Sequence, residues 1–231
     1  MEMFEVGTTN FVEQNRAQGK PTKEVLLPVD INRDSDLLVV VDVQNDFCTG
    51  GSLEVKDGEQ VIPYVNYLVP KFAHVVYSQD WHPPRHSSFA SEHEGKSPFE
   101  TTTMPYGEQT LWPDHCVQNT QGSEFRPDLH MPSTAMVVRK GRDPAIDSYS
   151  AFFENDRRTK TGCDGLLHDR GIKRVFVVGL AYDFCVRFTA EDARKLGSEV
   201  YIVKDACRPV GLPGSIEAAE KAFADLGITV C

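Results

Sequence analysis

One pattern recurs three times in the C-terminal part of the chain and restricts the fold more than any other feature. Each copy is a helix-forming segment, then a glycine at the helix end, then a short apolar strand. The glycines are Gly171, Gly197 and Gly227, and the strands that follow begin at Val175, Val200 and Ile228. Glycine commonly ends helices because it adopts the left-handed conformation without a steric penalty. Alternating helices and strands predict an α/β fold with a parallel sheet.

Three apolar runs earlier in the chain supply further strands. Residues 37–43 form a run that only Asp42 interrupts, and such runs are typical of a parallel strand covered on both faces. Strands are also predicted at residues 73–78 and 135–138, with a helix over residues 59–72. The sequence therefore predicts a three-layer α/β/α architecture around a central, mainly parallel, doubly wound sheet.

Two segments fall outside this pattern. Residues 1–34 hold few periodic apolar positions, so we expect an N-terminal extension packed on a single domain of residues 35–231. Residues 85–133 lack periodicity and are rich in Pro, Gly, Ser, Thr and His. Aromatic residues in this stretch argue against disorder, and a long irregular stretch inside a domain usually serves function.

Charge and cysteine usage exclude some partners. The net charge of −10 and the pI of about 5.2 argue against nucleic acid and anionic membranes. No apolar run approaches the ~20 residues of a membrane-spanning helix, and the N-terminus lacks the apolar core of a secretory signal. The six cysteines include no Cys-x-x-Cys pair, so we expect free thiols and a cytoplasmic protein.

Three residues able to do chemistry follow predicted strands. Asp42 ends the first strand, Lys140 follows the third, and Cys185 lies at the start of a predicted helix. Strand ends share one edge of a doubly wound sheet, so the three side chains are able to meet there. A thiol at a helix N-terminus has a lowered pKa, which makes Cys185 a candidate nucleophile. The ordinary alternatives are a buried inert thiol, a carboxylate bonded to backbone amides and a solvated lysine.

A second group of residues has the composition of a metal site. Asp80 and His82 lie two apart on an extended segment, so both side chains point to one side. His86 and His115 lie in the irregular stretch and are able to complete the site. Imidazole and carboxylate ligands suit zinc, iron or manganese. The alternative is a surface loop whose histidines make ordinary hydrogen bonds.

The motifs together identify a family. They are Val41-Asp42-Val43-Gln44-Asn45-Asp46-Phe47, Gln79-Asp80-Trp81-His82-Pro83, Trp112-Pro113-x-His115-Cys116-Val117, Lys140-Gly141, Tyr149-Ser150-Ala151-Phe152 and Cys185-Val186-x-x-Thr189-Ala190-x-Asp192-Ala193. In this order they resemble the nicotinamidases of the isochorismatase-like hydrolase superfamily, over residues 37–231. The motifs at Asp42 and Cys185 mark the superfamily, whereas those at Asp80 and Trp112 narrow the match to nicotinamidases.

The resemblance implies catalytic roles. Cys185 would be the nucleophile, Asp42 the general base and acid, and Lys140 a cation between them. The Leu180–Ala181 peptide bond would be cis, so that the Ala181 and Cys185 N–H groups form an oxyanion hole.

The resemblance also implies a metal and a pocket. Asp80, His82 and His115 would bind the metal, zinc by preference with iron and manganese as alternatives. His86 matches a position that is a ligand in some members only, so its role stays open. The walls of the ring pocket would be Phe47, Trp112 and Tyr149.

The implied reaction is hydrolysis of nicotinamide to nicotinate and ammonia through a thioacyl-enzyme, a step of NAD salvage. Assembly into a homo-oligomer is left open. One alternative is a metal-free hydrolase of the same superfamily, acting on another small amide or ester. Another, from a different class, is a thiol redox protein built on Cys185, which the lack of a nearby resolving cysteine disfavours.

Overall fold

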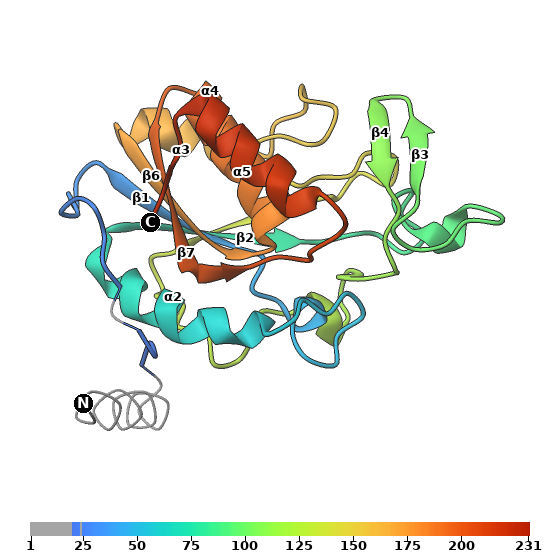
Figure 1. Cartoon of the computed structure of the whole chain (residues 1–231), viewed down its shortest axis with the longest axis horizontal. Coiled ribbons are helices and arrows are strands. Elements are labelled where there is room, and N and C mark those ends of the chain that lie inside the picture. The colour runs from blue at the N-terminus through green and yellow to red at the C-terminus, as the bar shows by residue number, and fades with distance from the viewer. Residues whose placement is uncertain (1–19, 24) are drawn as a thin grey trace, which may run out of the picture.

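A six-stranded sheet forms the centre of the molecule, in a computed structural model that describes residues 20–23 and 25–231 (Figure 1). Neighbouring strands run parallel, in the order β5-β2-β1-β6-β7-β8. They are β1 (Asp36–Val41), β2 (His74–Asp80), β5 (Met136–Lys140), β6 (Arg174–Leu180), β7 (Glu199–Arg208) and β8 (Thr229–Val230). The predicted parallel, doubly wound sheet is confirmed.

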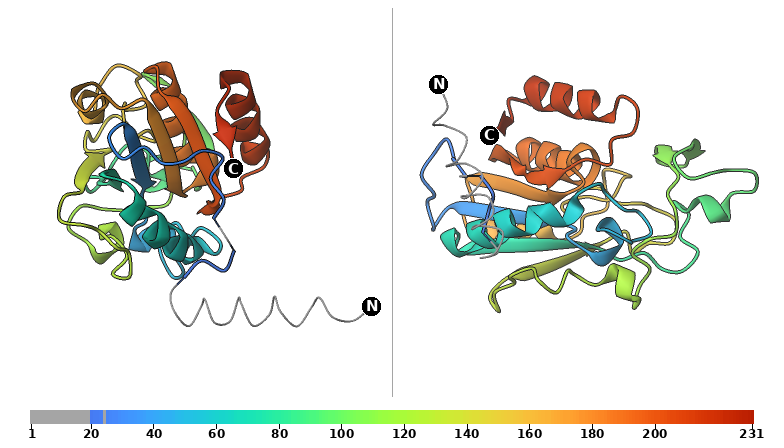
Figure 2. Two further views of the ribbon diagram at one scale, coloured as in Figure 1. Left: turned by 90° about the vertical axis from the view of Figure 1, so that its left-hand side faces the viewer. Right: turned by 60° about the horizontal axis from the view of Figure 1, so that its bottom comes forward.

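Helices cover both faces of the sheet and give the three predicted layers (Figure 2). They are α2 (Ile62–Leu68), α3 (Cys163–Asp169), α4 (Arg187–Lys195) and α5 (Ser215–Leu226). One apolar cluster lies between the sheet and α2, and a second lies between the sheet and α3, α4 and α5.

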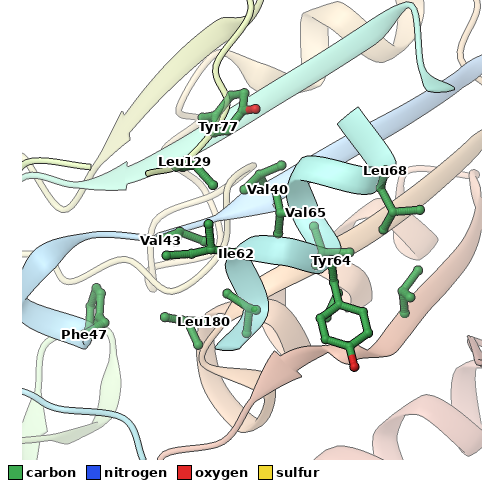
Figure 3. Packing of buried hydrophobic residues seen from close by; sticks show 14 of the residues in the cluster. Val40, Val43, Phe47, Ile62, Tyr64, Val65, Leu68, Tyr77, Leu129 and Leu180 are labelled. Carbon is green, nitrogen blue, oxygen red and sulfur yellow. The ribbon is translucent and has the colours of Figure 1, made fainter. Parts of the chain in front are cut away.

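Strand β1 contributes to both clusters because its successive side chains point to opposite faces. Leu38 and Val40 pack with α2, while Leu37 and Val39 pack with the other three helices. Figure 3 shows Val40 close to Val65 of α2. All four β1 side chains are fully buried, and burying each one stabilises the fold by about 1.5–3 kcal/mol. Burial on both faces explains why this run has no polar alternation.

The sheet has a topological switch point between β1 and β6. From β1 the chain moves outward through β2 to β5, returns to β6 on the other side of β1, and then moves outward to β8. Gly179 of β6 has a φ of +112°, and a Cβ atom there would overlap the Val41 carbonyl oxygen. Ligands of open α/β sheets bind outside the carboxyl ends of the strands at such a point. Asp42, Asp80 and Lys140 all lie at that edge.

A short antiparallel hairpin interrupts the irregular central stretch. It consists of β3 (Thr101–Met104) and β4 (Gly107–Thr110), and it projects beyond the end of the main sheet (Figure 1). Most of its side chains are exposed or half-buried, so no apolar alternation marks it in the sequence. The expectation that residues 85–133 lack regular elements was wrong for this hairpin.

The described part of the N-terminal extension lies against the domain. Its side chains pack against the apolar cluster between the sheet and α2, through Val25, Leu27 and Val29. Residues 1–19 and 24 of the predicted extension lie outside the described residues. The division into an extension of residues 1–34 and a domain of residues 35–231 stays a prediction. Of the helices in the described ranges, none has the length and apolar character needed to cross a membrane.

Candidate active site

The candidate nucleophile Cys185 lies in a helical turn directly after β6. The Leu180–Ala181 peptide bond is cis, as the resemblance implies. A π-helical turn over Tyr182–Val186 follows and continues into α4. The helix therefore begins at Tyr182, earlier than expected, and Cys185 is enclosed within the turn instead of standing at its first residue.

Lys140 joins the predicted catalytic groups. Its Nζ atom lies 2.8 Å from Asp42 Oδ2 and 3.5 Å from Cys185 Sγ. The same atom lies 2.5 Å from Asp80 Oδ1 and donates to the Ser148 carbonyl oxygen at 2.9 Å. The Lys140 side chain is 0% exposed. The structure thus brings the predicted aspartate, lysine and cysteine into one buried cluster.

The ammonium group of Lys140 organises the charges of this cluster. Burial alone would lower the pKa of Lys140, but Asp42 and Asp80 outweigh burial and hold that pKa well above its usual value. Burial would raise the pKa of Asp80, yet Lys140 and His82 hold it well below its usual range. Lys140 and Asp80 therefore form a buried ion pair. Removing one partner of such a pair typically costs about 3–5 kcal/mol.

Asp42 is a proton acceptor beside the thiol of Cys185. Ser78 Oγ donates to Asp42 Oδ1 at 2.8 Å, and a carboxylate oxygen of Asp42 lies within 4.8 Å of Cys185 Sγ. Burial raises the pKa of Asp42, with Lys140 opposing this effect. Burial also raises the pKa of the Cys185 thiol well above its usual value, again opposed by Lys140. The predicted lowering of this thiol pKa was wrong, because Cys185 is enclosed and lies beside a carboxylate.

Three side chains at the end of β2 converge as candidate metal ligands. Asp80 Oδ2 lies 3.6 Å from His82 Nε2 and 3.6 Å from His115 Nε2. His82 Nδ1 lies 3.1 Å from the Gly141 carbonyl oxygen, and His115 Nδ1 lies 2.8 Å from that of Pro113. Because a carbonyl oxygen only accepts, each Nδ1 carries the proton and each Nε2 lone pair is free for a metal. These residues fit a divalent ion with open positions for other ligands.

His86 lies beside these ligands but has other partners. Its ring centroid is 4.5 Å from that of His82. Its Nδ1 atom contacts Ser88 Oγ at 2.7 Å, and its Nε2 atom contacts the Asp143 carbonyl oxygen at 2.8 Å. Nε2 therefore carries the proton and has no lone pair to offer. A donor atom of His86 also lies within 4.8 Å of donor atoms of His82 and Asp147, so its role as a ligand stays open.

Gly141 supports the position of His82. Its φ is +64°, and a Cβ atom there would lie 2.5 Å from His82 Cε1. We expect Gly141→Ala to displace the imidazole and to weaken metal binding by about 10–100-fold, as losses of ligand support usually do. Metal titration of the purified variants measures this effect. The matched control is Gly162→Ala, where φ is +100° but a Cβ atom meets nothing within 4 Å. Equal metal affinity in the two variants would disprove the role of Gly141.

An aromatic pocket adjoins both the cysteine and the metal-ligand group. The predicted walls Phe47, Trp112 and Tyr149 all line it, together with Ala181 and Cys185. The other lining residues are Leu53, Asp80, His115, Asp147, Phe184 and Val210. Aromatic walls with a few convergent polar groups suit a small planar ligand.

Asp147 is an acidic lining residue that the sequence did not reveal. It is 2% exposed, and its Oδ1 atom lies 4.0 Å from His82 Nε2. It lies between the Lys140-Gly141 and Tyr149-Ser150-Ala151-Phe152 motifs, and no local spacing marks a carboxylate there as buried. The position of Phe184 in the pocket could have been predicted from the sequence, because Phe184 directly precedes Cys185.

Comparisons with known proteins identify relatives of this chain. The isochorismatase domain family matches residues 36–230. A nicotinamidase of Acinetobacter baylyi is 50% identical over 191 residues, which cover 83% of this chain and 89% of that protein. An L. infantum protein solved in complex with nicotinate is 39% identical with a TM-score of 0.77, covering 89% of this chain and 96% of that one. A Pyrococcus horikoshii pyrazinamidase solved with zinc is 35% identical with a TM-score of 0.69, covering 85% and 98%.

Proposed function

Because this chain belongs to the isochorismatase family, we propose that it acts as a nicotinamidase. It hydrolyses nicotinamide to nicotinate and ammonia, a reaction of NAD salvage. One observation carries the proposal: Cys185, which belongs to the buried cluster with Asp42 and Lys140, lines the same aromatic pocket as two of the metal-ligand residues. A pyridine carboxamide has a ring nitrogen for one end of this pocket and an amide for the other.

Amide hydrolysis needs an activated nucleophile and a proton donor for the leaving nitrogen. Asp42 takes the thiol proton as Cys185 Sγ attacks the carboxamide carbon and forms the C–S bond. Lys140 stabilises the negative charge on either partner, since its Nζ atom lies 2.8 Å from Asp42 Oδ2 and 3.5 Å from Sγ. Asp42 then protonates the nitrogen, the C–N bond breaks, and ammonia leaves a thioacyl-enzyme. Water activated by Asp42 hydrolyses the thioester, which releases nicotinate and restores the thiol.

The backbone N–H groups of Ala181 and Cys185 are the proposed oxyanion donors. Both residues line the pocket at the end where the thiol lies. Such donors stabilise the tetrahedral intermediate because they are already in place when its charge develops, and losing one typically costs about 3–4 kcal/mol.

Asp80, His82 and His115 would hold the metal ion, and the two imidazoles and one carboxylate suit zinc first, with iron or manganese as alternatives. When bound, the ion supplies a Lewis acid for the pyridine nitrogen. The side chains of the pocket then hold the ring between Phe47 and Trp112 with its carboxamide toward Cys185. Fixing both ends of a substrate in this way lowers the entropic part of the barrier.

Product analysis tests this function directly. Incubation with nicotinamide is expected to give nicotinate and ammonia in equal amounts. Benzamide, which has the same shape without the ring nitrogen, is expected to react with a kcat/KM at least ~10-fold lower, because it leaves the metal-ligand end of the pocket unpaired. Turnover of isochorismate or another small amide without turnover of nicotinamide would point to a different hydrolase of the superfamily.

The partners and location of the protein are proposed on narrower grounds. A small carboxamide is the partner that the pocket suits. A net charge of −10 disfavours nucleic acid and anionic membranes. A cytoplasmic location stays a prediction, and assembly into a homo-oligomer stays open.

A further inference from the structure

We propose that Gln109 is a positioning residue. It stands behind the wall of the pocket and orients the polar side chains of Asp147 and Tyr149 in that wall. This inference rests on the proposed function, because it concerns how the carboxamide substrate is held. Gln109 belongs to β4 of the hairpin that projects beyond the main sheet (Figure 1). Its side chain is 1% exposed, whereas its neighbours Gly107 and Glu108 are exposed. The hairpin therefore sends one buried polar side chain back toward the active site.

The side-chain nitrogen of Gln109 reaches two polar groups of the pocket wall. Nε2 donates to Asp147 Oδ2 at 2.6 Å and to Tyr149 Oη at 2.9 Å. The Thr110 carbonyl oxygen also lies 2.7 Å from Nε2, so the two amide hydrogens are shared among three acceptors. Asp147 and Tyr149 line the pocket, while Gln109 stands behind them. The amide therefore sets the directions of a carboxylate and a phenol that belong to the pocket wall.

The orientation of the Gln109 amide is fixed from its other end. Its Oε1 atom accepts hydrogen bonds from Tyr106 Oη and Asn155 Nδ2, both at 3.1 Å. Because both partners donate there, the oxygen faces them and the NH2 group faces Asp147 and Tyr149. Asn155 Oδ1 in turn accepts from the Tyr149 backbone N–H at 3.0 Å. A closed hydrogen-bond network thus joins the hairpin to the pocket wall.

This network leaves Tyr149 with a hydrogen to donate. Gln109 Nε2 and Trp112 Nε1 both donate to Tyr149 Oη, at 2.9 and 3.2 Å. Among residues 20–23 and 25–231, no acceptor takes the Tyr149 hydroxyl hydrogen. A ligand atom with a lone pair would complete the set. Gln109 therefore holds one donor, Tyr149, and one acceptor, Asp147, ready on the pocket wall.

Substituting Gln109 by glutamate tests the proposal. Gln109→Glu keeps the side-chain size and the acceptor for Tyr106 and Asn155, but it replaces the donor NH2 by an oxygen facing Asp147. We expect the KM for nicotinamide and the Kd for nicotinate to rise about tenfold, as for a lost hydrogen bond to a charged group, while kcat changes less than about threefold. The matched control is Glu108→Gln on the same hairpin, which should leave both constants within about twofold.

Gln109→Leu is the second variant, because it removes donor and acceptor without adding charge and carries the test if Gln109→Glu does not fold. A rise of KM and Kd at unchanged kcat in the folded variant supports the positioning role. A KM and a Kd within about twofold of wild type, even with a lower Tm, would overturn the positioning role. Gln109 would then only stabilise the packing of the hairpin. Absence of nicotinamide turnover by the wild-type protein refutes the proposed function instead, and nicotinate affinity then still tests Gln109. Absence of nicotinate binding by the wild-type protein would overturn both.

Discussion

Replacing Cys185 with alanine is expected to lower the rate of ammonia release from nicotinamide by at least about a thousandfold. Without Sγ no thioacyl-enzyme forms, and the oxyanion donors and the metal-ligand group have no nucleophile to assist. The change removes a single atom from a side chain that is 6% exposed and adds no polar group, so the fold should persist. Metal content should equal that of the wild type, because the sulfur is not one of the three ligands.

The matched control for this variant is Cys163→Ala. Cys163 is a free thiol at the start of α3 and is 0% exposed, so its removal has a similar packing cost. Its turnover should stay within about twofold of wild type. Turnover of Cys185→Ala within about tenfold of wild type would mean that another group attacks the amide.

Replacing Asp80 with alanine should remove both a metal ligand and a partner of Lys140. We expect metal affinity and kcat/KM each to fall by at least about 100-fold, because two imidazoles alone bind a metal weakly and orient substrate poorly. Lys140 also loses the carboxylate that lies 2.5 Å from its Nζ atom but keeps Asp42 at 2.8 Å, so stability should fall by about 1–3 kcal/mol. Elemental analysis, steady-state kinetics and denaturant unfolding measure the three effects.

His86→Gln is the matched control for the metal measurement. Glutamine retains a donor for the Asp143 carbonyl oxygen, and His86 is not among the three converging ligands. Metal affinity should therefore change by less than about threefold. Full metal content in Asp80→Ala would refute the site, and loss of metal from His86→Gln would make His86 a ligand.

The catalytic edge of the sheet could be predicted from the sequence because its central strands β1, β2 and β6 are buried on both faces. A continuous apolar run ends at Asp42, shorter apolar runs precede Asp80 and Lys140, and parallel strands bring their carboxyl ends together. On the other side of the switch point, Gly171, Gly197 and Gly227 end helices and so predicted the strands β6, β7 and β8 that follow them. The apolar runs of the buried strands are a strong signal in the sequence, and the ends of these strands gave the position of the site.

The parts that the sequence did not reveal depend on features without a local pattern. The β3–β4 hairpin faces solvent, so its strands show no apolar period, and Gln109 resembles any polar residue of an exposed loop. Asp147 is buried through tertiary contacts that its neighbours in the sequence do not indicate. The raised pKa of Cys185 results from enclosure beside Asp42, which position relative to a helix end does not predict.

Ammonia release from nicotinamide, measured before metal removal, after chelation and after addition of zinc, is the most direct test of a metal-dependent cysteine nicotinamidase. We predict that activity falls with the metal content and returns when zinc is restored. Activity that ignores chelation would refute the role of Asp80, His82 and His115 as ligands of a required ion. No ammonia from the metal-loaded protein would refute the assignment of nicotinamide as its substrate.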